Sequence, residues 1–334
     1  MRRMIRTQVR QVVMAAALAA LAAAPAAHAQ LAVQHDSTVV SETAGNGNGV
    51  PEPGDTLALT ENVVSVDPDQ TFTGVSGTLS STSPDVTVGA SSSAYSDLLF
   101  GVPTPNSSPY SVALASTAEC GAPVPFNLAL QTSAGPTDVA FELPTGSAGP
   151  ATSYDSSDVP RAIPDGDLSG VTSALTVAGS GGRAKHVVVR IGKITHTYDG
   201  DLTVWLVAPD GRSVMLVSHK GADGDNFVDT VFDDSAAASI TSRTVAPFTG
   251  TFRPAEPLSE MDGAPLAGTW ALKIVDDSSG DFGSIDAWGA DISPAVCAPQ
   301  QPPPPPSPPA HDCGKGSGKG ALKPPKHDHV CPNV

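Results

Sequence analysis

The sequence predicts an all-β protein in which two β-rich regions follow one another along the chain. Short runs that alternate apolar and polar residues, such as Val86–Val88 and Phe126–Leu130, recur between turns rich in Gly, Pro and Ser. No helical period is sustained in either region. All three tryptophans and five of the nine phenylalanines fall in the second region, so we expect it to have the better core.

Residues 1–29 have the pattern of a secretory signal peptide. Four arginines precede an apolar run, and the segment closes on Ala27-His28-Ala29, an A-x-A cleavage site. No later apolar stretch is long enough to cross a bilayer. We therefore expect a secreted or extracellular protein, with the periplasm and the cell surface as alternatives.

The chain is strongly acidic. Without the leader it has 14 Lys and Arg against 34 Asp and Glu, a net charge of −20. Nucleic acid and anionic lipid would be repelled by such a surface. The charge excludes nucleic acid as a partner and suits divalent cations or a cationic protein.

Composition divides the remaining chain into four segments. Residues 30–146 are rich in Ser, Thr, Val, Gly and Pro and read as an antiparallel β-sandwich, and 147–158 are small and polar, typical of a linker. The second β-rich region occupies 159–293. Residues 294–334 form a tail that begins with a proline run, for which we expect a polyproline II spacer.

Four cysteines in an exported chain should be oxidised. Cys313 with Cys331 is the simplest pair because it closes a short loop within the tail. Cys120 with Cys297 then follows by elimination and would tie the first region to the end of the second. If the tail thiols stayed reduced, Cys313 and Cys331 with the nearby histidines would form a zinc or copper site instead.

Aspartates gather around a predicted hairpin in the second region. Leu202–Ala208 and Ser213–Ser218 read as its two strands, joined by Pro209-Asp210-Gly211, and Asp199-Gly200-Asp201 lies at its entrance. Two further segments, GADGDNFVDTVFDDSA and VDDSSGDFGSIDAWGADI, are read as loops that bring more carboxylates to the same end. Calcium binds such oxygens in flexible loops, but ordinary solvated turns explain the spacing equally well.

Several motifs in this region stand in the order found in one known family. They are VPRAIPD, ITHTYDGDLTVWLVAPDG, DNFVDTVFDD, PFTGTFRPAEPLSEMDG and GTWALKIVDDSSGDFGSIDAWGADI. Residues 152–293 thereby resemble the P domain (P/Homo B domain) of kexin- and furin-like proprotein convertases and of bacterial secreted proteases. The resemblance implies a jelly-roll β-sandwich, often calcium-stabilised, beside a catalytic domain. It also implies a set of calcium ligands or supports: Asp201, Asp225, Asp229, Asp233, Asp234, Asp276, Asp277 and Asp281.

The first region has a weaker resemblance, carried by GNGNGVPEPGDTLALTENVV and VSGTLSSTSPDVTV. It is similar to Ig-like sandwiches of bacterial secreted peptidases and surface proteins. That resemblance implies a second calcium site at Asn46, Asn48, Glu52 and Asp55, with a plain Gly-rich turn as the alternative.

The sequence predicts no catalytic centre. The G-T-S-x-[AS] and H-G-[ST] motifs of subtilisin-like proteases are missing, and so is H-E-x-x-H. His196 is interpreted as a structural residue that hydrogen-bonds a turn, and the three tryptophans as core residues rather than a stacking platform. We expect a secreted, non-catalytic accessory or binding module with calcium as its structural cofactor, and an exported protease or an extracellular protein as its partner. The alternatives are the accessory part of a serine endopeptidase system whose protease is separately encoded, and an adhesion or substrate-binding protein.

Overall fold

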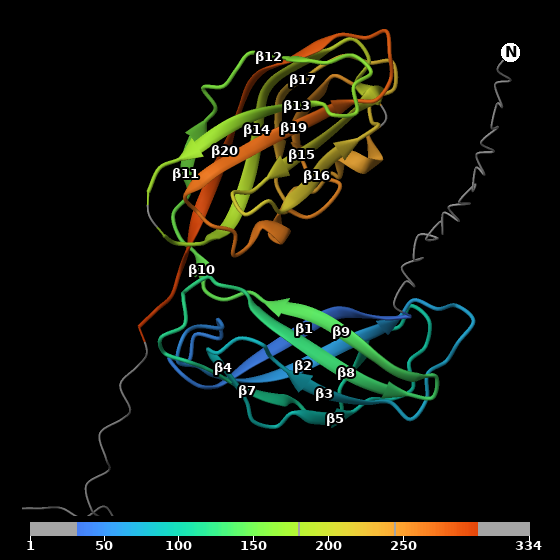
Figure 1. Cartoon of the computed structure of the whole chain (residues 1–334), viewed down its shortest axis with the longest axis vertical. Helices are drawn as coiled ribbons and strands as arrows, with labels where there is room; N and C mark the ends of the chain where they lie inside the picture. Colours follow the sequence, from blue (N-terminus) through green and yellow to red (C-terminus); the bar gives the residue numbers. More distant parts are fainter. Residues whose placement is uncertain (1–31, 180, 244, 300–334) are drawn as a thin grey trace, which may run out of the picture.

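The computed structural model describes residues 32–299 except Ser180 and Thr244. Nearly every described element is a β-strand, and the strands form four sheets arranged as two sandwiches, one above the other in Figure 1. The predicted leader, the predicted Cys313–Cys331 pair and the tail from residue 300 lie outside the described residues. No helix within the described part is long and apolar enough to span a membrane.

The N-terminal sandwich has one sheet in the order β1-β2-β7-β4, with β6 beside β2, and a second in the order β5-β3-β8-β9. Its strands are β1 (Val33–Ala44), β2 (Thr56–Ser65), β3 (Ser76–Ser80), β4 (Val86–Val88), β5 (Ser92–Ala94), β6 (Thr104–Pro105), β7 (Tyr110–Leu114), β8 (Val124–Thr132) and β9 (Gly135–Leu143). Along β2 and most of β8 every second side chain is buried, as the alternating sequence predicts. The buried faces meet in one core.

The C-terminal sandwich has one sheet in the order β13-β19-β15-β16 and a second in the order β20-β14-β17-β18. Its strands are β13 (Val171–Val177), β14 (Ala184–His196), β15 (Leu202–Val207), β16 (Ser213–Ser218), β17 (Phe227–Phe232), β18 (Phe248–Phe252), β19 (Gly268–Asp276) and β20 (Gly283–Val296). Three single-turn helices connect them: η1 (Asp199–Asp201), η2 (Ile240–Ser242) and η3 (Leu258–Met261). The predicted hairpin is confirmed, since β15 and β16 pair antiparallel.

Large aromatic side chains fill the C-terminal core. Trp270 and Trp288 are buried together with Phe227 and Phe248. Trp205 is half-buried, with the Lys273 ammonium 5.8 Å from its ring centroid. The interpretation of the tryptophans as core residues is therefore confirmed for Trp270 and Trp288.

Half of the segment 147–158, for which the sequence predicts a linker, forms β-strands in the structure. β10 (Ser147–Ala148) and β11 (Thr152–Asp155) both pair antiparallel with β20, and β12 (Arg161–Ile163) continues along the same strand. Small polar residues suit an edge strand as well as a loop, and here the long partner β20 supplies the hydrogen bonds that decide between them.

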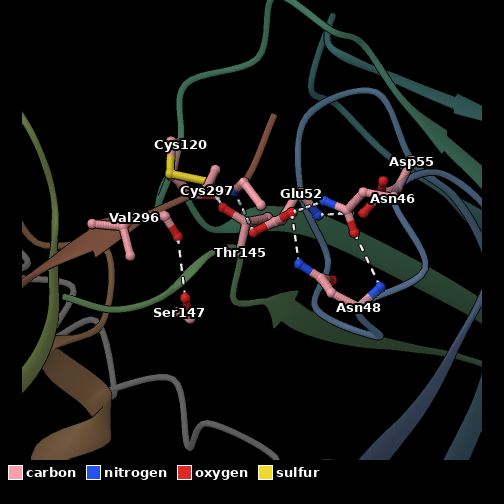
Figure 2. The surroundings of a disulfide bond; sticks show 11 residues. Asn46, Asn48, Glu52, Asp55, Cys120, Thr145, Ser147, Val296 and Cys297 are labelled. Atoms are coloured by element: carbon pink, nitrogen blue, oxygen red, sulfur yellow. Dashed lines mark hydrogen bonds between the residues drawn. A yellow bond between two sulfur atoms is a disulfide. The ribbon is translucent and has the colours of Figure 1, made fainter. Parts of the chain in front are cut away.

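The two sandwiches are joined by the Cys120–Cys297 disulfide. Figure 2 shows it beside Glu52, whose buried carboxylate accepts a hydrogen bond from the Ala298 N–H at 2.9 Å. An ion pair between Arg183 and Glu119, at 2.6 Å, also crosses the junction. The last described residues of the chain are thus fixed to the first sandwich.

Candidate functional site

Five loops meet at the end of the C-terminal sandwich that lies away from the junction, and we call this region the acidic end. They are residues 165–170, 197–201, 219–226, 245–247 and 277–283. Hydrogen bonds connect them, including Asp199 N–H to Gly224 O at 2.9 Å and Asp277 N–H to Asp201 O at 3.3 Å. Antiparallel pairing of β14, β15, β19 and β20 brings the loops together, because these strands begin or end there.

Asp199 is the innermost carboxylate of the acidic end. Its side chain belongs to η1, it is 1% exposed, and neither carboxylate oxygen makes a well-formed hydrogen bond. Burial raises the pKa of Asp199 to about 7, the charge of Asp225 adds to this effect, and the Asn226 N–H partly offsets it. A buried carboxylate without partners is costly in a folded protein. This residue therefore needs either a proton or a cation.

The turn that covers Asp199 has an unusual backbone. Ala222 and Asn226 have left-handed φ angles of 49° and 74°, which cost about 1–2 kcal/mol for Ala222 and less for Asn226. Gly221 has φ 105°, and a Cβ placed there would lie 2.8 Å from the Cβ of Asp199. The turn is thus folded tightly over the carboxylate, and only glycine fits at position 221.

His196 lies beneath η1 and is fully enclosed. Its Nε2 is 3.2 Å from Asp276 Oδ2, its Nδ1 is 2.9 Å from Tyr198 O, and both side chains of the His–Asp pair have no exposed surface. A general base must reach the proton that it removes from a substrate. His196 instead holds the end of β14 to the end of β19, which agrees with its interpretation as a structural residue.

The outer carboxylates of the acidic end are partly engaged with neighbouring side chains. Asp277 Oδ2 is 2.8 Å from His219 Nε2, and Asp281 accepts a hydrogen bond from Thr197 Oγ1 at 2.8 Å. The pKa of Asp201 is raised, first by burial and then by the charges of Asp276 and Asp281. The carboxylate of Asp201 is therefore repelled by those of Asp276 and Asp281.

Three of the predicted ligands or supports, Asp229, Asp233 and Asp234, lie away from the acidic end. The segment 225–234 contains β17, and six residues of strand span about 20 Å. Asp233 and Asp234 stand at the far end of β17, where Asp234 accepts the N–H groups of Leu258 and Ser259, both at 2.8 Å. Asp229 lies within the strand and borders a hollow of about 340 Å³ on the sheet.

Side chains alone do not complete a metal site. Among residues 32–299, apart from the two omitted positions, no three His, Cys, Asp or Glu side chains converge closely enough to hold an ion. Backbone carbonyl oxygens, which calcium accepts as ligands, would have to complete any coordination. The turn at 221–226 brings such oxygens next to Asp199.

The four residues of the second predicted calcium site do lie together, but they bind one another. The amide groups of Asn46 and Asn48 donate to the same oxygen of Glu52, at 2.5 and 3.0 Å (Figure 2). The side-chain oxygens of both asparagines accept backbone N–H groups, and Asp55 accepts the Glu52 N–H at 2.8 Å. The arrangement is that of a hydrogen-bonded turn, the alternative considered from the sequence.

Asp199 is the residue that sequence reasoning missed. The Asp-Gly-Asp motif was a visible signal, but the motif alone does not show which of its two aspartates points inward. The single turn of η1 decides this, because it directs Asp199 under the 221–226 turn and leaves Asp201 partly exposed.

Most of the C-terminal sandwich is similar in sequence to a known protein family. Residues 184–292 match the proprotein convertase P-domain. The chain is 30% identical over 126 residues to leupeptin-inactivating enzyme 1 of Streptomyces exfoliatus, which is 38% of this chain and 23% of that protein. It is 37% identical over 127 residues to the transglutaminase-activating metalloprotease of Streptomyces mobaraensis, which is 38% of this chain and 13% of that protein.

The chain thus spans less than a quarter of the length of these curated relatives. Among solved structures, the serine protease of Aeromonas sobria in complex with its chaperone matches 52% of this chain and 37% of that chain at 16% identity. Its TM-score of 0.31 is too low to support a common fold. The family match covers residues 184–292, which include most strands of the C-terminal sandwich, and this sandwich is called the P domain below.

Proposed function

We propose that this chain is an exported, non-catalytic accessory module that acts beside a protease. The observation that supports it is a P domain in a sequence that lacks the serine-protease and H-E-x-x-H motifs. One Streptomyces relative is named as an enzyme and the other as a metalloprotease, and the similarity covers a segment about the size of this domain. The leader pattern of residues 1–29 supports export.

We further propose that calcium stabilises the acidic end. Asp199 and Asp225, with carbonyl oxygens of the 221–226 turn, would hold the ion, and the remaining aspartates of the acidic end would support it. The unpartnered carboxylate of Asp199 carries this proposal, because a cation is the simplest compensation for a buried charge. Calcium would supply positive charge and oxygen coordination there, not chemistry on a substrate.

Thermal unfolding of the purified chain without its leader tests the calcium proposal. The midpoint should rise with calcium relative to chelator, and the native state should gain about 2.7 kcal/mol when calcium is a hundredfold above its dissociation constant. Asp199→Asn should abolish this gain, while Asp97→Asn, the same change at an exposed site of the other sandwich, should retain it. An unchanged midpoint in wild type would overturn the calcium proposal.

Casein hydrolysis by the same sample tests the accessory role. We expect no activity above that of buffer. Proteolysis that follows the protein through a further purification step, and that persists in an Asp199→Asn sample, would show that the chain itself catalyses.

A further inference from the structure

The acidic end also carries the most exposed apolar side chains of the P domain. Leu168, Val245 and Phe282 are 74%, 71% and 68% exposed, and Tyr198 is 36% exposed. Contacts place them on adjoining loops: the Thr197 N–H donates to Phe282 O at 3.2 Å, and the Gly280 N–H donates to the Asp165 carboxylate at 2.8 Å. A Cβ on Gly224 would lie 2.8 Å from the Cβ of Ala246, next to Val245.

Carboxylates surround these apolar side chains. The exposed or half-exposed ones are Asp165, Asp167, Asp201, Asp223, Asp225, Asp277 and Asp281. The cationic side chains within the same described loops are His219 and Lys220, and His219 is already paired with Asp277. The surface therefore suits a basic segment that also carries apolar residues.

The tail of this chain has that chemistry. Between Cys313 and Cys331 it contains Lys315, Lys319, Lys323 and Lys326, with Leu322 and two prolines among them, against one aspartate. The described body is strongly acidic, whereas the tail from Cys297 has four lysines against two aspartates and is a net-positive segment that this chain could offer to its own surface.

The length of the spacer matches the distance to be covered. β20 runs from Gly283 at the acidic end to Val296 at the junction, which is about 43 Å at about 3.3 Å per residue. The chain from Cys297 to Lys315 covers at most about 56 Å at the polyproline II rise of about 3.1 Å per residue. A tail that leaves the junction can therefore return along the outside of the P domain to its acidic end.

We propose that residues 313–331 bind the acidic end of the P domain of their own chain, with the lysines facing the aspartates and the apolar residues on Tyr198 and Phe282. Tethering makes this contact intramolecular, so it forms at low protein concentration. Salt weakens it, because the charges involved are exposed. The contact needs no protease partner, and because it uses aspartates that the calcium proposal also assigns, its test is run without calcium.

Carbodiimide cross-linking of the full-length chain, without its leader and in chelator, tests the proposal. Mass spectrometry should find tail lysines joined to Asp201, Asp225, Asp277 or Asp281, with a yield that does not change on dilution and falls severalfold in high salt. Tyr198→Ser with Phe282→Ser should lower the yield severalfold, and Leu99→Ser with Phe100→Ser, a matched change on the N-terminal sandwich, should leave it unchanged.

Two results would overturn the proposal. Tail lysines joined equally often to the exposed Asp69, Asp97 and Asp138 of the N-terminal sandwich would show that the acidic end is not preferred. A yield that falls in proportion to dilution would show that the tail binds other molecules rather than its own P domain. Because the experiment is run in chelator, neither result depends on the calcium proposal.

Discussion

Two carboxylates with the same burial differ in how the protein satisfies them. Glu52 in the N-terminal sandwich and Asp199 in the P domain are each 1% exposed. Glu52 accepts hydrogen bonds from Asn46, Asn48 and Ala298, whereas neither oxygen of Asp199 has a well-formed partner. A satisfied carboxylate stabilises the fold by itself, and an unsatisfied one indicates a ligand or a proton.

Removal of the satisfied carboxylate should have the largest effect. Glu52→Ala removes the charged acceptor of three part-buried hydrogen bonds, each worth about 1.5–3 kcal/mol and less where the donor can reach water, and we expect a loss of about 3–5 kcal/mol in the free energy of unfolding. Urea denaturation with and without calcium measures it, and the loss should be the same in both. The exposed Glu142→Ala is the matched control, and a Glu52→Ala loss no larger than that of the control would contradict the assignment.

Removal of the nearby disulfide should cause the second-largest loss in the free energy of unfolding. Cys120→Ser with Cys297→Ser frees the junction beside Glu52, and we expect a loss of about 2–4 kcal/mol. Urea denaturation measures this as well. If Glu52 depends on the disulfide to hold Ala298 in place, Glu52→Ala should cost less in this background than in wild type, and strict additivity would show that the two act separately.

Asp199 should make the free energy of unfolding depend on pH. The pKa of Asp199 is raised in the folded state to about 7, so the native protein binds more protons than the unfolded chain between about pH 4 and 7. Stability in chelator should therefore fall as pH rises through this window, by about 1–3 kcal/mol. Asp199→Asn should flatten this fall, and a parallel pH profile for the variant would contradict the assignment.

Asp234 is a carboxylate of the P domain that, unlike Asp199, accepts hydrogen bonds. Its oxygens accept two backbone N–H groups at the start of η3, so it should behave as Glu52 does, but with a smaller effect because it is partly exposed. Asp234→Ala should cost about 1 kcal/mol, the usual value of such a cap. Thermal unfolding should show this loss equally with calcium and with chelator.

The fold was predictable where the pattern was local. Alternation in β2 and β8, and the hairpin of β15 and β16, are written in the residues themselves. The sequence predicts a loop at β17, because aspartates within and beside this segment favour a turn, whereas its β-branched and aromatic residues form a strand in the structure. The pairing of 147–155 with β20 depends on a strand more than 130 residues away, which local sequence does not encode.

The candidate site was predictable as a region but not residue by residue. The aspartate-rich segments do bring Asp201, Asp276, Asp277 and Asp281 to one end of the sandwich. Asp233 and Asp234 do not lie at this end, because the strand β17 separates them from it. The sequence does not predict Asp199 as a site residue, because its burial depends on the tertiary position of the 221–226 turn.

The attachment of Cys297 and Ala298 to the first sandwich has a consequence for the order in which the chain folds. The N-terminal sandwich emerges first, yet the partner of Cys120 lies 177 residues further along the chain, and the third donor to Glu52 comes one residue after that. Domains of a nascent chain generally fold as units from the N-terminus. The first sandwich must therefore wait, with one thiol and one buried carboxylate incompletely partnered, until the whole P domain has been made.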